Sequence, residues 1–221
     1  MNLSVKELVI QKINNNEKEM HNCKYVFIDN KSEITNIIFT GAGQKYYMMM
    51  SWFNEDKNHN YLYLNTLYLD YSNTEIYTKI IESCNSKFYN MIGVSYGGYA
   101  AIVYATLFPT RAVIVIDPAR LAWNIHLEPY ILKLNSMLFY HRSSHIHDIL
   151  EYMQIRNALE KTKLWYMMRC SQIEVHSSNI PNENMILEYI EHAKNMLDDK
   201  CQILMKETTM KDLFLEFLPW T

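Results

Sequence analysis

The sequence contains little glycine, proline or cysteine, and it has no long hydrophobic run. Its 221 residues include five glycines, five prolines and four cysteines. The cysteines are scattered without a C-x-x-C pair, so neither a disulfide framework nor a zinc site is predicted. No stretch approaches the roughly 18 apolar residues of a membrane span, and residues 1–20 lack the apolar region of a signal peptide. These absences predict a cytoplasmic protein without a membrane span.

An excess of charge of one sign is also absent. The 21 Lys and Arg residues and 24 Asp and Glu residues leave a net charge of -3 at pH 7. The basic residues are dispersed, so a nucleic-acid partner is not predicted. Apolar residues make up 49% of the chain and charged residues 20%, as in ordinary globular proteins. A chain of this length and composition is expected to form one domain over residues 1–221.

Apolar runs that alternate with segments of helical spacing indicate an α/β fold. Strands are predicted at residues 36–39, 61–69, 88–92, 112–116, 164–168 and 202–205. Helices are predicted at residues 75–84, 99–108, 183–197 and 211–218, and helical segments over 129–159. The alternation predicts a parallel sheet with helices on both faces. Residues 125–160 are expected to form a helical lid insertion.

All five glycines lie in two short loops, each directly after a predicted strand. The first loop reads TGAG (40–43) and the second reads GVSYGG (93–98). In the pattern G-x-S-x-G, the glycines let a strand turn sharply into a helix, which lifts the serine hydroxyl out of the sheet at the helix N-terminus. Because a predicted strand precedes Ser95 and a small-residue helix follows it, Ser95 is the predicted nucleophile. The structural alternative is a glycine-rich turn in another α/β protein, such as a flavodoxin-like one.

Three segments around these loops resemble the α/β-hydrolase superfamily: FTGAG (39–43), GVSYGGYAAIVYA (93–105) and AVIVIDP (112–118). They are similar in particular to small bacterial serine hydrolases and acyltransferases of polysaccharide and surface-glycan loci. The resemblance implies an acyl-serine intermediate on Ser95. It also implies an oxyanion hole made by the backbone amide of Tyr96 and that of Ala42 or Gly43. Backbone donors suit this role because they are oriented before the negative oxygen forms.

The resemblance further implies the chain order Ser, acid, His, with the histidine after the last strand. The loop after the predicted last strand contains no histidine, and none follows His192. His176, in the loop after the strand predicted at 164–168, is one candidate base, which Glu174 or Asp117 would orient. Alternation in IEVH (173–176) would put Glu174 and His176 on one side. The structural alternatives are a surface position for His176 and a helix-capping role for Asp117.

Two further interpretations remain open. The base could be a histidine of the predicted lid, where four histidines occur: His126, His141, His145 and His147. The spacing of His141 and His145 resembles that of metal ligands, but solvated side chains and no metal are the prediction for these residues. Alternatively the triad is incomplete, and the protein is a catalytically degenerate binding or scaffold protein.

The sequence as a whole predicts a serine acyl hydrolase or acyltransferase of the esterase or glycan O-acetyl-transfer type. Ser95 would attack an ester or thioester carbonyl, so the expected substrate is a small-molecule ester or an acylated glycan. No metal or organic cofactor is implied, because the reaction needs a nucleophile, a base and oriented dipoles. In a transferase, acetyl-CoA or another acyl donor would be the co-substrate.

Overall fold

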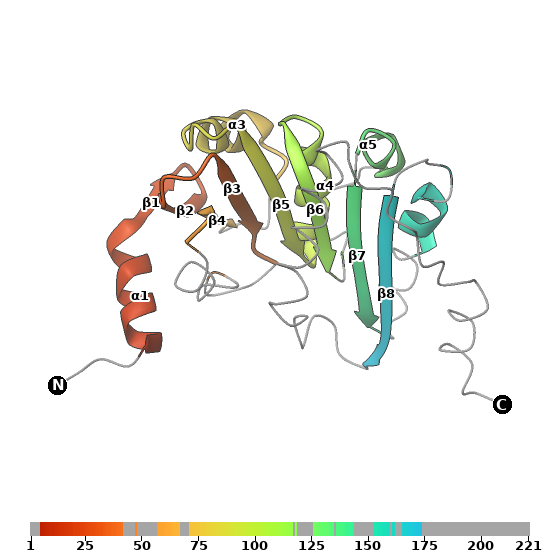
Figure 1. Ribbon diagram of the computed structural model, residues 1–221, viewed down its shortest axis with the longest axis horizontal. Coiled ribbons are helices and arrows are strands. Elements are labelled where there is room, and N and C mark those ends of the chain that lie inside the picture. The colour runs from red at the N-terminus through yellow and green to blue at the C-terminus, as the bar shows by residue number, and fades with distance from the viewer. Residues whose placement is uncertain are drawn as a thin grey trace.

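The computed structural model describes residues 5–41, 47, 57–66, 71–116, 118, 126–134, 136–143, 153–159, 161 and 165–173. These residues form an eight-stranded sheet of order β1-β2-β4-β3-β5-β6-β7-β8 (Figure 1). The strands are β1 Glu17–Met20, β2 Cys23–Ile28, β3 Ile34–Phe39, β4 Asn60–Thr66, β5 Phe88–Val94, β6 Thr110–Ile116, β7 Ser136–Ser143 and β8 Trp165–Ile173. The helices are α1 Val5–Asn16, α3 Thr74–Glu82, α4 Tyr96–Ala105 and α5 Glu128–Ile131, and residues 153–159 are also helical.

The α/β fold predicted from the sequence is confirmed, but the sheet is mixed. The strands from β4 to β8 in the sheet order run parallel to one another. Strand β2 is antiparallel to both of its neighbours, β1 and β4. The expectation of a wholly parallel sheet is therefore wrong at this edge. Only a two-residue turn, His21-Asn22, joins β1 to β2, and such a short connection permits only an antiparallel pair.

The segment predicted as a helical lid contributes a strand to the sheet. Residues 128–131 and 153–159 are helical, but β7 pairs in parallel with both β6 and β8. The prediction of helix over 129–159 is therefore wrong at β7. Residues 137–140 (MLFY) form an apolar run, a pattern that a strand buried on both faces shares with a buried helix. Here the hydrogen bonds to β6 on one side and to β8 on the other stabilise the strand.

Most of the other predicted elements are confirmed. The strands predicted at 36–39, 61–69, 88–92, 112–116 and 164–168 correspond to β3, β4, β5, β6 and β8. The helices predicted at 75–84 and 99–108 correspond to α3 and α4. The elements predicted at 183–197, 202–205 and 211–218 lie outside the described residues. Within the part of the chain that is described, no helix has the length and apolar character needed to cross a membrane.

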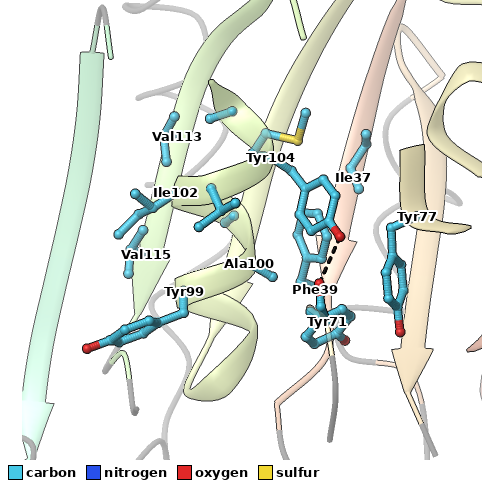
Figure 2. Close-up of a cluster of buried hydrophobic side chains, with 14 of the residues drawn as sticks. Ile37, Phe39, Tyr71, Tyr77, Tyr99, Ala100, Ile102, Tyr104, Val113 and Val115 are labelled. Carbon is cyan, nitrogen blue, oxygen red and sulfur yellow. Dashed lines mark hydrogen bonds between the residues drawn. The ribbon is translucent and has the colours of Figure 1, made fainter. Parts of the chain in front are cut away.

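Helices cover both faces of the sheet. On one face, the buried cluster combines side chains of α3, α4 and α5 with Ile37, Met91 and other strand residues. On the other face, Val9 and Ile13 of α1 belong to a second buried cluster. All ten residues of α4 are buried, as expected of an apolar helix that is enclosed on every side. Figure 2 shows this helix against β3 and β6.

Gly97 allows the closest approach of α4 to the sheet. A Cβ at this position would overlap the carbonyl oxygen of Phe39 and lie 2.7 Å from its carbonyl carbon. Strand β3 cannot withdraw easily, because it is hydrogen-bonded to β4 on one side and to β5 on the other.

We therefore expect Gly97→Ala to lower the free energy of unfolding by about 3 kcal/mol or more, or to prevent folding. The control is Ala101→Gly in the same buried helix, which should cost about 1 kcal/mol through the lower helix propensity of glycine. Urea unfolding followed by circular dichroism measures both losses. A Gly97→Ala protein as stable as the wild type would contradict the close approach.

Candidate active site

Ser95 occupies the turn between β5 and α4 in a strained backbone conformation. Its φ is 54° and its ψ is -125°. Four described non-glycine residues have a positive φ, and Ser95 is the buried one, with 8% of its surface exposed. The other three lie at exposed positions: His21, Lys31 and Asn85. A conformation of this kind costs about 1–3 kcal/mol and persists only where the surroundings enforce it. The strained strand-to-helix turn is the one that G-x-S-x-G predicts.

Backbone contacts on several sides hold this turn. The amide of Ser95 donates to the carbonyl oxygen of Ile116 in β6 at 2.9 Å, and the amide of Gly98 donates to the carbonyl oxygen of Ser95 at 2.9 Å. A Cβ at Gly93 would overlap the carbonyl oxygen of Gly97. Both glycines of the motif are therefore needed for steric reasons, and the serine is tied to β6 and to α4.

The N-terminus of α4 points to a site for negative charge. Ser95 is the N-cap residue, yet its side chain makes no capping hydrogen bond to the helix, although serine commonly caps helices in this way. The first amides of a helix and its dipole stabilise an anion. The amides of Ser95 and Gly98 already donate to backbone carbonyls. Tyr96, the predicted oxyanion donor, is the first residue of this helix.

The loop after β3 begins beside the serine. A Cβ at Gly41 would lie 3.2 Å from the Cβ of Ser95 and 3.1 Å from the carbonyl oxygen of Val94. Thr40 anchors this loop, because its amide donates to the carbonyl oxygen of Leu64 in β4 at 3.0 Å. The first glycine of TGAG thus packs against Ser95. Ala42 and Gly43, the predicted donors, lie outside the described residues.

Tyrosines surround the start of this loop. The ring of Tyr71 is fully buried and contacts the rings of Phe39, Tyr77 and Tyr96 at centroid distances of 5.4, 5.1 and 5.7 Å. The hydroxyl of Tyr104 donates to the carbonyl oxygen of Tyr71 at 2.8 Å (Figure 2). Burial raises the pKa of the Tyr71 hydroxyl well above its ordinary value, so the phenol remains a donor. No sequence pattern marks this cluster, because tyrosine is abundant throughout the chain.

The strand register aligns the ends of the strands that precede the predicted base and acids. Val94, Ile116 and Tyr140 lie side by side across β5, β6 and β7, and these strands point to the same edge of the sheet (Figure 1). Strand β8 runs parallel to β7 and ends at that edge. Asp117 follows β6, whereas Glu174 and His176 follow β8. All three of these residues lie outside the described ranges.

The histidines whose side chains are described lie away from Ser95. His59 directly precedes β4, at the edge where the parallel strands begin. His21 lies in the turn between β1 and β2, on the other side of β4 and β3 from the serine. His126 is exposed just before α5, which lies where β7 begins (Figure 1). His141 lies in β7, but its side chain, like all of His145, His147 and His192, lies outside the description.

The described residues also offer no metal centre: they contain no group of three or more His, Cys, Asp or Glu side chains arranged to hold an ion. Burial raises the pKa of the Cys23 and Cys84 thiols to about 12, so both are protonated at neutral pH.

No family model and no curated protein matches the chain in sequence. Several solved structures, however, are similar to it in fold. The capsule O-acetyltransferase of Neisseria meningitidis serogroup A has a TM-score of 0.54 and 13% identity, with 82% of this chain and 94% of that chain covered. The Pyrococcus furiosus esterase Pf2001 has a TM-score of 0.54 and 13% identity, with 90% of this chain and 94% of that chain covered.

A third is the α/β hydrolase MGS-MChE2, from a metagenome of lagoon sediments. It has a TM-score of 0.58 and 10% identity, with 80% of this chain and 99% of that chain covered. Similarity at such low identity shows the fold alone. The resemblance expected from FTGAG, GVSYGGYAAIVYA and AVIVIDP is thereby confirmed at the level of architecture: the chain has the α/β-hydrolase fold.

Proposed function

We propose that the protein is a serine acyl hydrolase or acyltransferase in which Ser95 becomes acylated. The observation that carries this proposal is the strained, buried backbone of Ser95 at the junction of β5 and α4, with Gly41 packed against it. Strain at a strand-to-helix turn is expected where it presents a nucleophile at a helix N-terminus. The occurrence of esterases and an O-acetyltransferase among the structural neighbours supports the same class of chemistry.

In this mechanism, the Oγ atom of Ser95 attacks the carbonyl carbon of an ester or thioester. The amide of Tyr96 and that of Ala42 or Gly43 stabilise the negative carbonyl oxygen, because they are oriented before the charge develops. The acyl–Oγ bond forms as the bond to the leaving alcohol or thiol breaks, and the base passes the serine proton to that leaving group. Water or a sugar hydroxyl then accepts the acyl group.

His176 is the base in this proposal. Strand β7 lies between β6 and β8, and both β7 and β8 end at the edge of the sheet where Ser95 lies. In the chain order Ser, acid, His, the acid would follow β7 and the histidine would follow β8. In the sequence, His176 comes shortly after β8, and Asp148, a residue that no sequence pattern singled out, comes shortly after β7. Glu174 and Asp117 are the alternative acids.

The proposed reaction uses no metal or organic cofactor. Hydrolysis needs a small-molecule ester, whereas transfer needs acetyl-CoA or another acyl donor and a hydroxyl acceptor. The structural similarity to a capsule O-acetyltransferase supports a glycan as the acceptor, and the similarity to esterases supports hydrolysis. Both reactions share the acyl-serine intermediate, so the same first experiment tests them.

We expect a fluorophosphonate probe to label the wild-type protein at Ser95, with one probe per chain, and to leave Ser95→Ala unlabelled. Mass spectrometry of the modified peptide locates the adduct. Ser86→Ala removes a serine hydroxyl at the opposite end of β5 and should be labelled at the wild-type rate. If the folded wild type is neither labelled nor able to hydrolyse short-chain esters, the mechanism is wrong, and a binding or scaffold role replaces it.

Replacement of His176 by alanine should lower kcat for a short-chain ester by about 10³-fold or more, because the serine loses its general base. The control is His59→Ala, which alters a histidine at the opposite edge of the sheet and should leave kcat unchanged. Initial rates of ester hydrolysis measure both. If His176→Ala is fully active and a variant of His141, His145 or His147 is inactive, the base is instead one of these three histidines, which lie in β7 or follow it in the sequence.

Gly41→Ala should slow the acylation of Ser95 about tenfold or more while leaving KM nearly unchanged. The new methyl group would press on the Cβ of Ser95 and the carbonyl oxygen of Val94, and small displacements of reacting groups are costly. Stopped-flow measurement of probe labelling gives the rate, and a thermal melt checks that the variant is folded. A folded Gly41→Ala protein that reacts at the wild-type rate would contradict this packing.

A further inference from the structure

Tyr71 lies just before α3 and reaches the first of two backbone segments that flank Ser95. Its hydroxyl donates to the carbonyl oxygen of Thr40 at 2.9 Å and also lies 3.2 Å from the carbonyl oxygen of Leu64. The carbonyl of Thr40 belongs to the same peptide unit as the amide of Gly41. Since Gly41 packs against Ser95, this hydrogen bond restrains the peptide plane at the start of the oxyanion loop.

The ring of Tyr71 contacts the second segment. It stacks on the ring of Tyr96 with a centroid distance of 5.7 Å and an interplanar angle of 30°. Tyr96 follows Ser95 directly and is the first residue of α4, where its amide is the proposed oxyanion donor. One side chain therefore binds the loop after β3 and packs against the start of α4.

Tyr71 is itself held in one position. Its ring makes an edge contact with Phe39 at an interplanar angle of 83° and a tilted contact with Tyr77. The side chain has no exposed surface, and aromatic rings enclosed in this way have little freedom to move. Tyr71 therefore has the rigidity that a spacer between the two segments needs.

We propose that Tyr71 is a positioning residue of the oxyanion hole, which fixes the loop after β3 relative to the N-terminus of α4. The inference rests on the proposed function, because it concerns the same site. Tyr71 acts through Thr40 and Tyr96 and does not touch the substrate. A displacement of about 1 Å in a catalytic group can reduce a rate about 100-fold, so a spacer that separates two donors has a large effect on acylation.

The test compares Tyr71→Phe with Tyr104→Phe. Each change removes one buried hydroxyl that donates to a backbone carbonyl in the same aromatic cluster, and each keeps the ring. Only the Tyr71 hydroxyl is bound to the loop that packs against Ser95. Loss of one buried hydrogen bond should lower Tm by roughly 2–4 °C in both variants. The two variants should therefore be equally stable, and only the reactivity of Ser95 should differ between them.

We expect Tyr71→Phe to lower the maximal rate of fluorophosphonate labelling at Ser95 about tenfold, with the half-saturating probe concentration within about twofold of wild type. Ester hydrolysis should lose kcat to the same extent at unchanged KM. Tyr104→Phe should remain within about twofold of wild type in both assays. Slow labelling in Tyr71→Phe alone would distinguish a positioning role from a loss of stability, because a purely structural role would slow both variants or neither.

Three results would overturn the inference. Labelling of folded Tyr71→Phe at the wild-type rate would remove the positioning role and leave Ser95 as the nucleophile. Equal slowing of both variants would assign the effect to stability. An unlabelled wild type would refute the proposed function and the positioning role together. If Tyr71→Phe does not fold, Tyr96→Leu removes the stacked ring and keeps the backbone amide. Tyr96→Leu should then be slowed similarly, and a wild-type rate in that variant would refute the proposal.

Discussion

The close approach of α4 to the backbone of β3 is the constraint on which the site depends. Gly97 has no side chain, so the first turn of the helix can lie against the carbonyl of Phe39. That position places the helix N-terminus at the end of β5, where the turn at Ser95 has a φ of 54° and a ψ of -125°. The pairing of β5 with β3 and β6 resists relaxation of the turn. The stability of the sheet thus maintains local strain at the serine.

Those parts of the fold that depend on local sequence could be predicted. Five glycines in two loops located Ser95 and the loop beside it, because these turns need residues without a Cβ. The β-branched run of β6 identified a buried strand in the same way. The mixed edge and β7 were missed. A short apolar run such as residues 137–140 fits both a helix and a strand, and only its pairing with β6 and β8 decides between them.

The missed strand also affected the interpretation of the candidate site. With β7 predicted as helix and the last strand predicted at 202–205, the loop expected to carry the histidine contained none. The proposed role of Tyr71 could not be predicted for another reason. Its partners, Thr40 and Tyr96, are distant along the chain and meet only after β3, β4 and α4 have packed. No pattern of neighbouring residues encodes a contact of this kind.

The N-terminal edge of the sheet has a consequence for the behaviour of the protein in solution. Strand β1 (EKEM) is short, and its three charged residues are exposed, with Glu17 paired to Lys24 of β2 at 3.0 Å. An open edge of a sheet is a template for pairing with other chains, and exposed charges oppose such pairing. The hairpin of β1 and β2 thus acts as a barrier against edge-to-edge aggregation in a chain that is 49% apolar.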